Sequence, residues 1–279
     1  LKDNGGEAAA RSRTAELGRR FLDLNDAGRV RFLCLMADNY AVDEVHLTEV
    51  IESWLSADSD QRVRLEAKLR SALEPPRMKL LTQFNELPQG VKFLVDMRSE
   101  LLRLRLEHPN LVPLELDLKR LLGAWFDVGL LQLEEINWGS SAELLEKLIA
   151  YEAVHAIQSW TDLKNRLDSD RRCFAFFHPN MPDEPLIFVE VALVKGMANN
   201  VQALLDESAP LEDIRLADTA IFYSISNAQK GLSGISFGNF LIKSVVKKLQ
   251  QEFPQLKQFA TLSPIPGFCR WLDSTDSAK

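Results

Sequence analysis

The chain has 279 residues, of which 46% are hydrophobic and 26% are charged, a balance typical of a globular protein with one large or two moderate domains. The formal net charge of −7 argues against a general nucleic-acid-binding protein, because binding to many phosphates requires a basic surface. Three widely spaced cysteines fit no disulfide or metal pattern, and no apolar run approaches the roughly 20 residues that span a bilayer, so we expect a cytoplasmic protein without a membrane partner.

The first half of the chain carries apolar residues at helical spacing and shows no strand pattern before about residue 170. A helical stretch is expected from Glu7 to Ala37, with a break at 25–28. Further helices are predicted over residues 42–55, 61–73, 80–87, 91–106 and 114–131. We therefore predict a helical bundle over residues 1–138 and a second domain over residues 139–279.

The second domain is predicted to begin with a helix from Ala142 to Ile157, for which Ser141 is the N-cap. A helical segment from Trp160 to Leu167 extends it. His155 is a candidate acid or base in this region, but a structural histidine is the simpler interpretation.

Two strands are predicted next, over residues 172–178 and 186–194, joined by a proline-rich segment. Both strands are apolar on both faces, as expected for a sheet that is covered by helices. Glu190 is an acid inside the second strand and needs a partner if it is buried. A structural ion pair is its simpler interpretation and a catalytic role the alternative; His178, at a strand end, is ambiguous in the same way.

The stretch from Asp218 to Trp271 reads as a strand, a glycine-bearing turn, an amphipathic helix, a second strand and a proline-bearing loop. Gly231 and Gly234 permit close backbone approach to a ligand, and Lys230 adds a positive charge. Unpaired N–H groups at the start of the following helix favour a phosphate. The alternative is an ordinary turn between a strand and a helix.

The second strand of this stretch is predicted from Gln258 to Ser263. Thr261 and Ser263 are two residues apart, so their hydroxyls are expected on the same face of the strand. If the helix crosses over so that the two strands are parallel, the hydroxyls and the glycine turn converge on one cleft.

Three blocks of the second half, DRRCFAFFHPNMPDEPLIFVEVALV, SISNAQKGLSGISFGNFLIK and TLSPIPGF, resemble the malonyl-CoA decarboxylase family. The resemblance is strong over about residues 138–271 and more diffuse in the helical part. It implies an α+β protein: an all-α helical bundle that mediates homo-oligomer formation, as a dimer or tetramer, followed by an α/β acetyltransferase-like (GNAT) domain. One departure is that Gly231 and Gly234 are three residues apart, whereas the last two small residues of the usual acetyltransferase turn are two apart.

In such a domain an acyl-CoA lies against a splayed strand, with its pyrophosphate at the following turn. The resemblance therefore implies that the turn binds the CoA part of malonyl-CoA or acetyl-CoA through Ser226, Asn227, Ala228, Gln229, Lys230, Gly231, Leu232, Ser233 and Gly234.

The reaction that the resemblance implies converts malonyl-CoA to acetyl-CoA and CO₂, in fatty acid and malonate metabolism, without a metal or an organic cofactor. In the family a hydroxyl near the TLSPIPGF segment orients the carboxylate, and a histidine well downstream protonates the product carbanion. Ser263 is our first choice for the hydroxyl and Thr261 the second.

The downstream histidine has no counterpart here, because all four histidines precede the TLSPIPGF segment. We therefore expect the acetyltransferase-like domain to be incomplete at its C-terminal end and the chain to decarboxylate poorly by itself. Two alternatives remain open: an acyl-CoA-dependent N-acyltransferase, with Glu190 as the candidate base, and a non-catalytic CoA-binding module.

Overall fold

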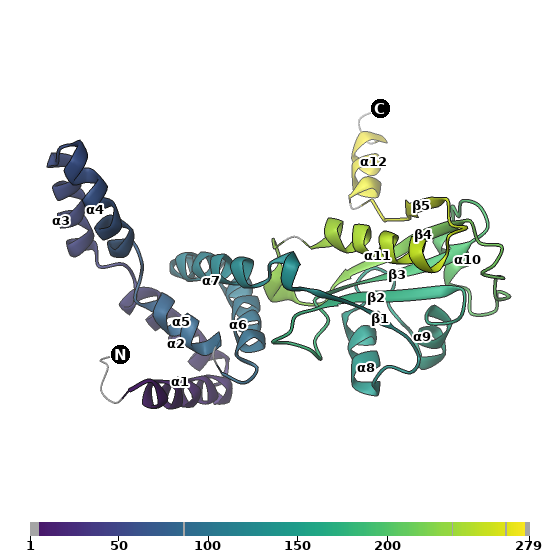
Figure 1. Cartoon of the computed structure of the whole chain (residues 1–279). Helices are drawn as coiled ribbons and strands as arrows, with labels where there is room; N and C mark the ends of the chain where they lie inside the picture. Colours follow the sequence, from purple (N-terminus) through teal and green to yellow (C-terminus); the bar gives the residue numbers. More distant parts are fainter. Residues whose placement is uncertain (1–5, 86, 236, 266, 277–279) are drawn as a thin grey trace. The chain divides into compact units, whose positions relative to one another are not determined.

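A computed structural model of the chain describes residues 6–85, 87–235, 237–265 and 267–276. The chain divides into a helical unit, residues 1–127 with 230–235, and a sheet unit, residues 128–229 with 236–279 (Figure 1). The predicted fold class, a helical region followed by an α/β domain, is confirmed. Along the chain, the boundary between the two units lies after residue 127, whereas the sequence predicted it at residue 138.

The helical unit follows the predicted series of helices. They are α1 (Gly6–Asp23), α2 (Asp26–Asn39), α3 (Glu44–Ser56), α4 (Ser59–Ala72), α5 (Arg77–Asn85), α6 (Gly90–Leu104) and α7 (Val112–Trp125). Side-chain oxygens of Asn25, Asp43 and Asp58 accept backbone N–H groups at the starts of α2, α3 and α4, which explains where these helices begin. The unit's core is built from side chains with no exposed surface, among them Leu33, Leu81, Phe84, Leu94, Leu101, Leu118 and Leu122.

The sheet unit contains a five-stranded sheet in the order β1-β2-β3-β4-β5. Its strands are β1 (Gln132–Ile136), β2 (Arg171–Phe177), β3 (Ile187–Val194), β4 (Thr219–Asn227) and β5 (Gln258–Thr261). Neighbouring strands from β1 to β4 are antiparallel, whereas β4 and β5 are parallel. The helix α11 (Gly238–Glu252) was predicted between these two strands, and it is the crossover that makes them parallel, which the sequence had left as a condition.

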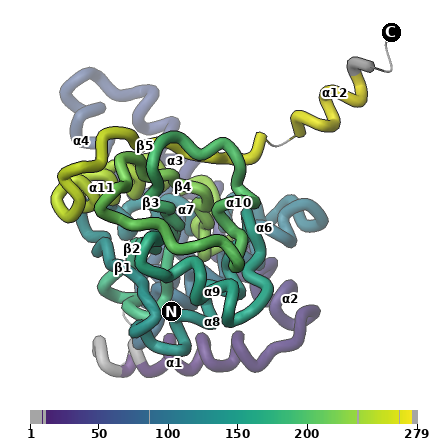
Figure 2. The backbone as a smooth tube through the Cα atoms, turned by 90° about the vertical axis from the view of Figure 1, so that its right-hand side faces the viewer, coloured from purple at the N-terminus to yellow at the C-terminus, as the bar shows by residue number. Residues whose placement is uncertain are grey.

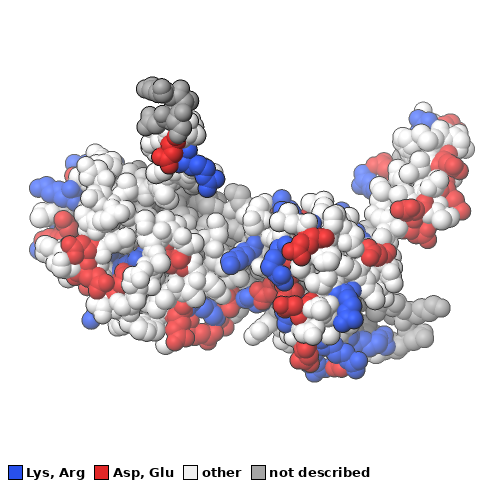
Figure 3. Space-filling model, turned by 180° about the vertical axis from the view of Figure 1, so that it is seen from behind, with Lys and Arg blue, Asp and Glu red and all other residues white. Residues whose placement is uncertain are grey.

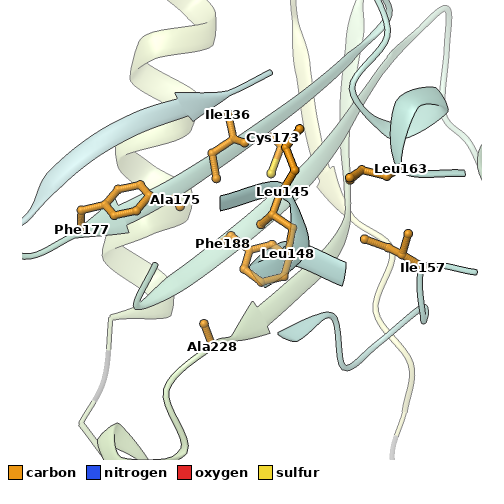
Figure 4. Packing of buried hydrophobic residues seen from close by; sticks show 10 residues of the cluster. All are labelled: Ile136, Leu145, Leu148, Ile157, Leu163, Cys173, Ala175, Phe177, Phe188 and Ala228. Carbon is orange, nitrogen blue, oxygen red and sulfur yellow. The ribbon is translucent and has the colours of Figure 1, made fainter. Parts of the chain in front are cut away.

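Helices cover both faces of the sheet. The helices α8 (Ala142–Tyr151) and α9 (Trp160–Arg166) lie on one face and α11 on the other (Figures 1 and 2). On the α8 side, leucines of α8 and α9 pack with residues of β1, β2 and β3 in one buried cluster (Figure 4). The short helix α10 (Val201–Leu205) contributes Leu204 to a second cluster, with Ala192 and Ile221. The sheet is therefore buried on both faces, as its apolar strands predict.

The differences from the sequence-based expectations include two elements that were not predicted and one helix that ends early. β1 was not predicted, because its short Gln-Leu-Glu-Glu-Ile run directly follows helical periodicity. The helix predicted to reach Ile157 ends at Tyr151, since Glu152 leaves the helical conformation with ψ of 112°. A C-terminal helix, α12 (Phe268–Asp276), was not predicted either.

The surface of the described residues carries mixed charges. On the face shown in Figure 3, basic and acidic side chains are interspersed over both units. Within the described ranges, none of the helices combines the length and the apolar character that crossing a membrane requires.

Candidate functional site

Strand β4 carries a bulge in its middle. Glu190 of β3 pairs with Ser224, but the next β3 residue pairs with Phe222, so Tyr223 is an extra residue. The register with β5 runs only from Thr219 to Phe222, where β5 ends at Thr261. The C-terminal half of β4 therefore continues past the end of β5, and no strand of the described residues pairs with its edge there.

Glu152 holds this half of β4 to the segment that follows α8. Its side chain is buried, and Oε1 accepts the hydroxyl of Ser224 at 2.7 Å and the N–H groups of Val154 and His155 at 2.9 and 2.8 Å. Oε2 accepts the hydroxyl of Ser226 at 2.9 Å. One carboxylate thus satisfies four buried or partly buried donors and explains why α8 ends where it does.

Glu190 lies on the same face of the sheet and is buried. Its Oε2 accepts Nη1 of Arg166 at 3.0 Å, and Nε of the same guanidinium donates to Asp162 at 2.7 Å. Burial raises the pKa of Glu190 to about 7, although Arg166 acts in the opposite direction, and nearby Glu152 adds to the increase. The structure therefore supplies the partner that the sequence required, and the ion pair accounts for Glu190 without a catalytic role.

The raised pKa of Glu190 predicts a pH-dependent stability. A carboxyl that titrates at about 7 in the folded chain and near 4.5 when unfolded binds more protons in the folded state between these values. Its contribution to stability is therefore lost as the pH rises through about 7. We expect the free energy of unfolding of the wild type, relative to Glu190→Gln, to rise by about 2 kcal/mol between about pH 8 and about pH 5.5.

Urea denaturation of both proteins at the two pH values measures this difference. Glu134→Gln, at an exposed position of β1, is the matched control and is expected to leave the pH dependence of the wild type unchanged. A wild type and a Glu190→Gln variant with the same pH dependence would contradict the prediction.

The two residues that directly follow β4, Ala228 and Gln229, are buried. Ala228 belongs to the buried cluster beneath α8 and donates its N–H to the carbonyl of Leu186. The Gln229 amide donates to Glu184 at 3.1 Å and to the Pro185 carbonyl at 3.0 Å. These two side chains are thus occupied by structural contacts, whereas Asn227 is exposed. Ligand binding by this segment remains a prediction that concerns its backbone.

The second part of the predicted turn, residues 230–235, belongs to the helical unit. It forms a 3₁₀ turn, Lys230–Leu232, against α6. Arg98 of α6 donates to the carbonyls of Gly231 and Ser233 and pairs with Glu115 of α7 at 2.8 Å. A Cβ atom at Gly231 would overlap the Val95 carbonyl, so the close approach expected of this glycine is to α6.

Thr261 and Ser263 are both exposed. Ala260 and Leu262 pack into the cluster on the α10 side of the sheet, so Thr261, between them, faces the opposite side. The Ser226 hydroxyl is bound to Glu152 on the α8 side, the same side as α10, so it does not share a face with Thr261. Pro266 of the following loop lies outside the described residues. The catalytic choice between the two hydroxyls remains a prediction.

The two candidate histidines, His155 and His178, lie in different surroundings. His155 is not helical, and among the described residues its Nε2 has no hydrogen-bond partner. His178 is buried, and its Nδ1 accepts the N–H of Asn180 at 3.1 Å. In the described ranges, no three His, Cys, Asp or Glu side chains lie close enough to hold a metal ion.

Sequence reasoning missed three buried charged residues: Glu152 and Arg166 in the sheet unit and Arg98 in the helical unit. Each is a buried charge with a partner farther along the chain: Ser224 is 72 positions after Glu152, Gly231 is 133 positions after Arg98, and Glu190 is 24 positions after Arg166. The only available signal was a charge on an otherwise apolar helix face, and for Glu152 the helical repeat concealed even that.

Sequence models of one family match nearly the whole chain. The malonyl-CoA decarboxylase C-terminal domain matches residues 129–279, and the N-terminal domain of the same family matches residues 40–126. The mitochondrial malonyl-CoA decarboxylase of Mus musculus is 41% identical over 88% of this chain and 52% of that protein. The mitochondrial enzyme of Anser anser anser is 38% identical over 94% of this chain and 55% of that protein.

Solved structures give the same result. The crystal structure of malonyl-CoA decarboxylase from Rhodopseudomonas palustris matches this chain with a TM-score of 0.91 at 41% sequence identity. The match covers 99% of this chain and 66% of that protein's chain. The crystal structure of the enzyme from Agrobacterium vitis has a TM-score of 0.89 at 44% sequence identity, and the match covers 96% of this chain and 65% of that protein's chain. The chain spans about half the length of the curated relatives that it matches.

Proposed function

Because the chain belongs to the malonyl-CoA decarboxylase family, we propose that it binds malonyl-CoA and takes part in its decarboxylation to acetyl-CoA and CO₂. One observation carries this proposal: Thr261 pairs with Phe222, the last β4 residue before the bulge. The hydroxyl-bearing end of β5 thus lies where the pairing of β4 with β5 ends. An extended acyl-pantetheine group along that edge would bring its thioester end close to Thr261 and Ser263.

The chemistry requires control of one bond. Cleavage of the C–C bond to the carboxylate releases CO₂ and leaves its electron pair as an enolate of the thioester, which a proton then converts to acetyl-CoA. The enolate forms readily only when that bond stands perpendicular to the thioester plane. We propose that the Ser263 hydroxyl donates a hydrogen bond to the carboxylate and holds it in this orientation, with Thr261 as the second choice. No metal or organic cofactor is needed for these steps.

Single-turnover assays test the proposal, with the chain in excess over malonyl-CoA so that a slow reaction is still measured. We expect Ser263→Ala to lower the rate of acetyl-CoA and CO₂ formation about 100-fold, because a positioning hydrogen bond in the transition state is lost. The affinity for malonyl-CoA should change less than about threefold. Ser208→Ala, an exposed serine of the loop after α10, is the control and should keep the wild-type rate.

Each other outcome has a definite meaning. Acetyl-CoA formation by Ser263→Ala at the wild-type rate would exclude the serine. Binding of malonyl-CoA by the wild type without CO₂ release would favour a non-catalytic module, and consumption only in the presence of an amine would favour an N-acyltransferase. Homo-oligomeric assembly and a cytoplasmic location belong to the same proposal, and the assay does not depend on either.

A further inference from the structure

The segment between β3 and β4, residues 195–218, carries α10 and lies over one face of the sheet. Leu204 of α10 is buried in a cluster that includes Ile221 of β4. Leu262, which directly follows β5, packs against the same cluster. The cluster that contains α10 therefore also holds the residue before Ser263, which is the first choice for the hydroxyl of the proposed reaction.

The helix α10 depends on contacts from the rest of the sheet unit, because a helix of five residues has little stability of its own. At its start, the side chain of Asn200 accepts the N–H of Gln202 at 2.8 Å. At its end, the Leu204 carbonyl accepts Nη2 of Arg171 at 3.1 Å. Arg171 is the first residue of β2 and is buried, so this bond fastens the end of α10 to the sheet.

Arg171 belongs to a buried ion pair that holds the segment at two points. Its Nη1 lies 2.7 Å from Oδ2 of Asp170, and the two side chains expose only 8% and 3% of their surface. The same Oδ2 accepts the N–H of Glu212, in the loop that follows α10, at 3.1 Å. The cation thus binds the backbone at Leu204 and the anion binds it at Glu212. Loss of either partner leaves the other charge buried and unpaired.

We propose that the Asp170–Arg171 pair positions the Ser263 hydroxyl for decarboxylation by fastening α10 to the sheet. Leu262 has two anchors: its N–H donates to the Phe222 carbonyl at 2.9 Å, and its side chain packs against the α10 cluster. Ser263 follows Leu262 directly and is exposed, so its position depends on these anchors. This inference rests on the proposed function, because it concerns the same hydroxyl.

Single-turnover formation of acetyl-CoA, with the full chain in excess over malonyl-CoA, tests the inference. We expect Arg171→Met to lower the rate about tenfold, because a loosened Leu262 lets Ser263 leave the reactive orientation. The affinity for malonyl-CoA should change less than about threefold, since Arg171 acts through α10 and not by contact with the substrate. Arg171→Lys keeps a cationic donor and should recover most of the rate.

Hydrogen exchange provides a readout that does not depend on activity. Peptides covering residues 258–265 should exchange faster in Arg171→Met than in the wild type, because the Leu262 N–H loses protection. Leu204→Ala should have the same two effects, since it removes the α10 side chain from the cluster. The two substitutions act through one contact, so the double variant should lose less rate than the product of the two single losses.

Two control variants distinguish positioning from general destabilisation. Arg215→Met removes an arginine of the same segment, with an exposed side chain that pairs with Asp213, and changes the net charge equally. Leu148→Ala truncates a buried leucine of α8 in the other cluster and destabilises the sheet unit. Both should keep the wild-type rate and the wild-type exchange of residues 258–265. Urea denaturation measures how far each variant is destabilised and shows that it is folded in the assay.

The outcomes separate this inference from the proposed function. Wild-type exchange of residues 258–265 in Arg171→Met would overturn the inference at any activity. Faster exchange with a wild-type rate would also overturn it and leave the proposed function intact, because Ser263 would not depend on the pair. An equal loss of rate in Leu148→Ala would overturn it as well, since the effect would be general. A wild type that binds malonyl-CoA without releasing CO₂ would contradict the proposed function and, with it, the positioning role.

Discussion

Replacement of Glu152 by alanine is expected to lower the free energy of unfolding of the sheet unit by about 4 kcal/mol. The substitution removes the acceptor for the hydroxyls of Ser224 and Ser226 and for the N–H groups of Val154 and His155. Both hydroxyls are buried, so water cannot replace the carboxylate without opening the structure. The loss should be felt first in the half of β4 that extends past β5, because Glu152 is its connection to the α8 segment.

Urea denaturation measures the total loss, and hydrogen exchange of peptides covering β4 locates it. Glu146→Ala, an exposed glutamate of α8, is the control and should change stability by less than about 0.5 kcal/mol. A triple variant that also carries Ser224→Ala and Ser226→Ala should recover part of the loss, since two unsatisfied donors are removed. A Glu152→Ala protein as stable as Glu146→Ala would show that the carboxylate does not hold β4.

The strand and helix order of the second half followed from local patterns. The apolar runs of β2, β3 and β4 are long, and an amphipathic helix was predicted between the two strands β4 and β5. The sequence considered a parallel pairing of these strands only as a condition, and the structure shows that they are parallel. β1 was not predicted, because two of its five residues are glutamates and its apolar pattern is therefore weak. It is an edge strand, which pairs only with β2. The predicted helix end at Ile157 was also wrong, since periodicity cannot show that the Glu152 side chain bonds to β4 and that the helix therefore ends at Tyr151.

Sequence reasoning predicted less of the candidate site than of the fold. Gly231 and Gly234 were identified as positions of close backbone approach, but what approaches Gly231 is α6, which no local pattern reveals. Arg98 lies on a helix whose periodicity predicts only which face is buried. The sequence therefore predicted a ligand-binding turn, which stays a prediction, and only the tertiary structure indicates which charges surround residues 230–235.

Replacement of Gly231 by alanine is expected to destabilise the helical unit by about 3 kcal/mol or more, because the new Cβ would overlap the backbone carbonyl of Val95. Backbone atoms cannot rotate away as a side chain does, so either α6 or residues 230–235 must shift. A shift of the turn also removes the acceptor of Arg98 at the Gly231 carbonyl and leaves part of a buried guanidinium unsatisfied.

Gly123→Ala, in the same unit, is expected to change the stability in the opposite direction. Gly123 is exposed in the interior of α7, and no atom lies within 4 Å of the position of its Cβ, so alanine should stabilise the helix by about 1 kcal/mol. Urea denaturation of both variants measures the two effects, and hydrogen exchange of peptides covering residues 230–235 shows whether Gly231→Ala releases the turn. If it does, acetyl-CoA binding should fall together with protection of the turn, whereas Gly123→Ala should leave both unchanged. A Gly231→Ala protein with wild-type stability would show that the turn does not pack on α6.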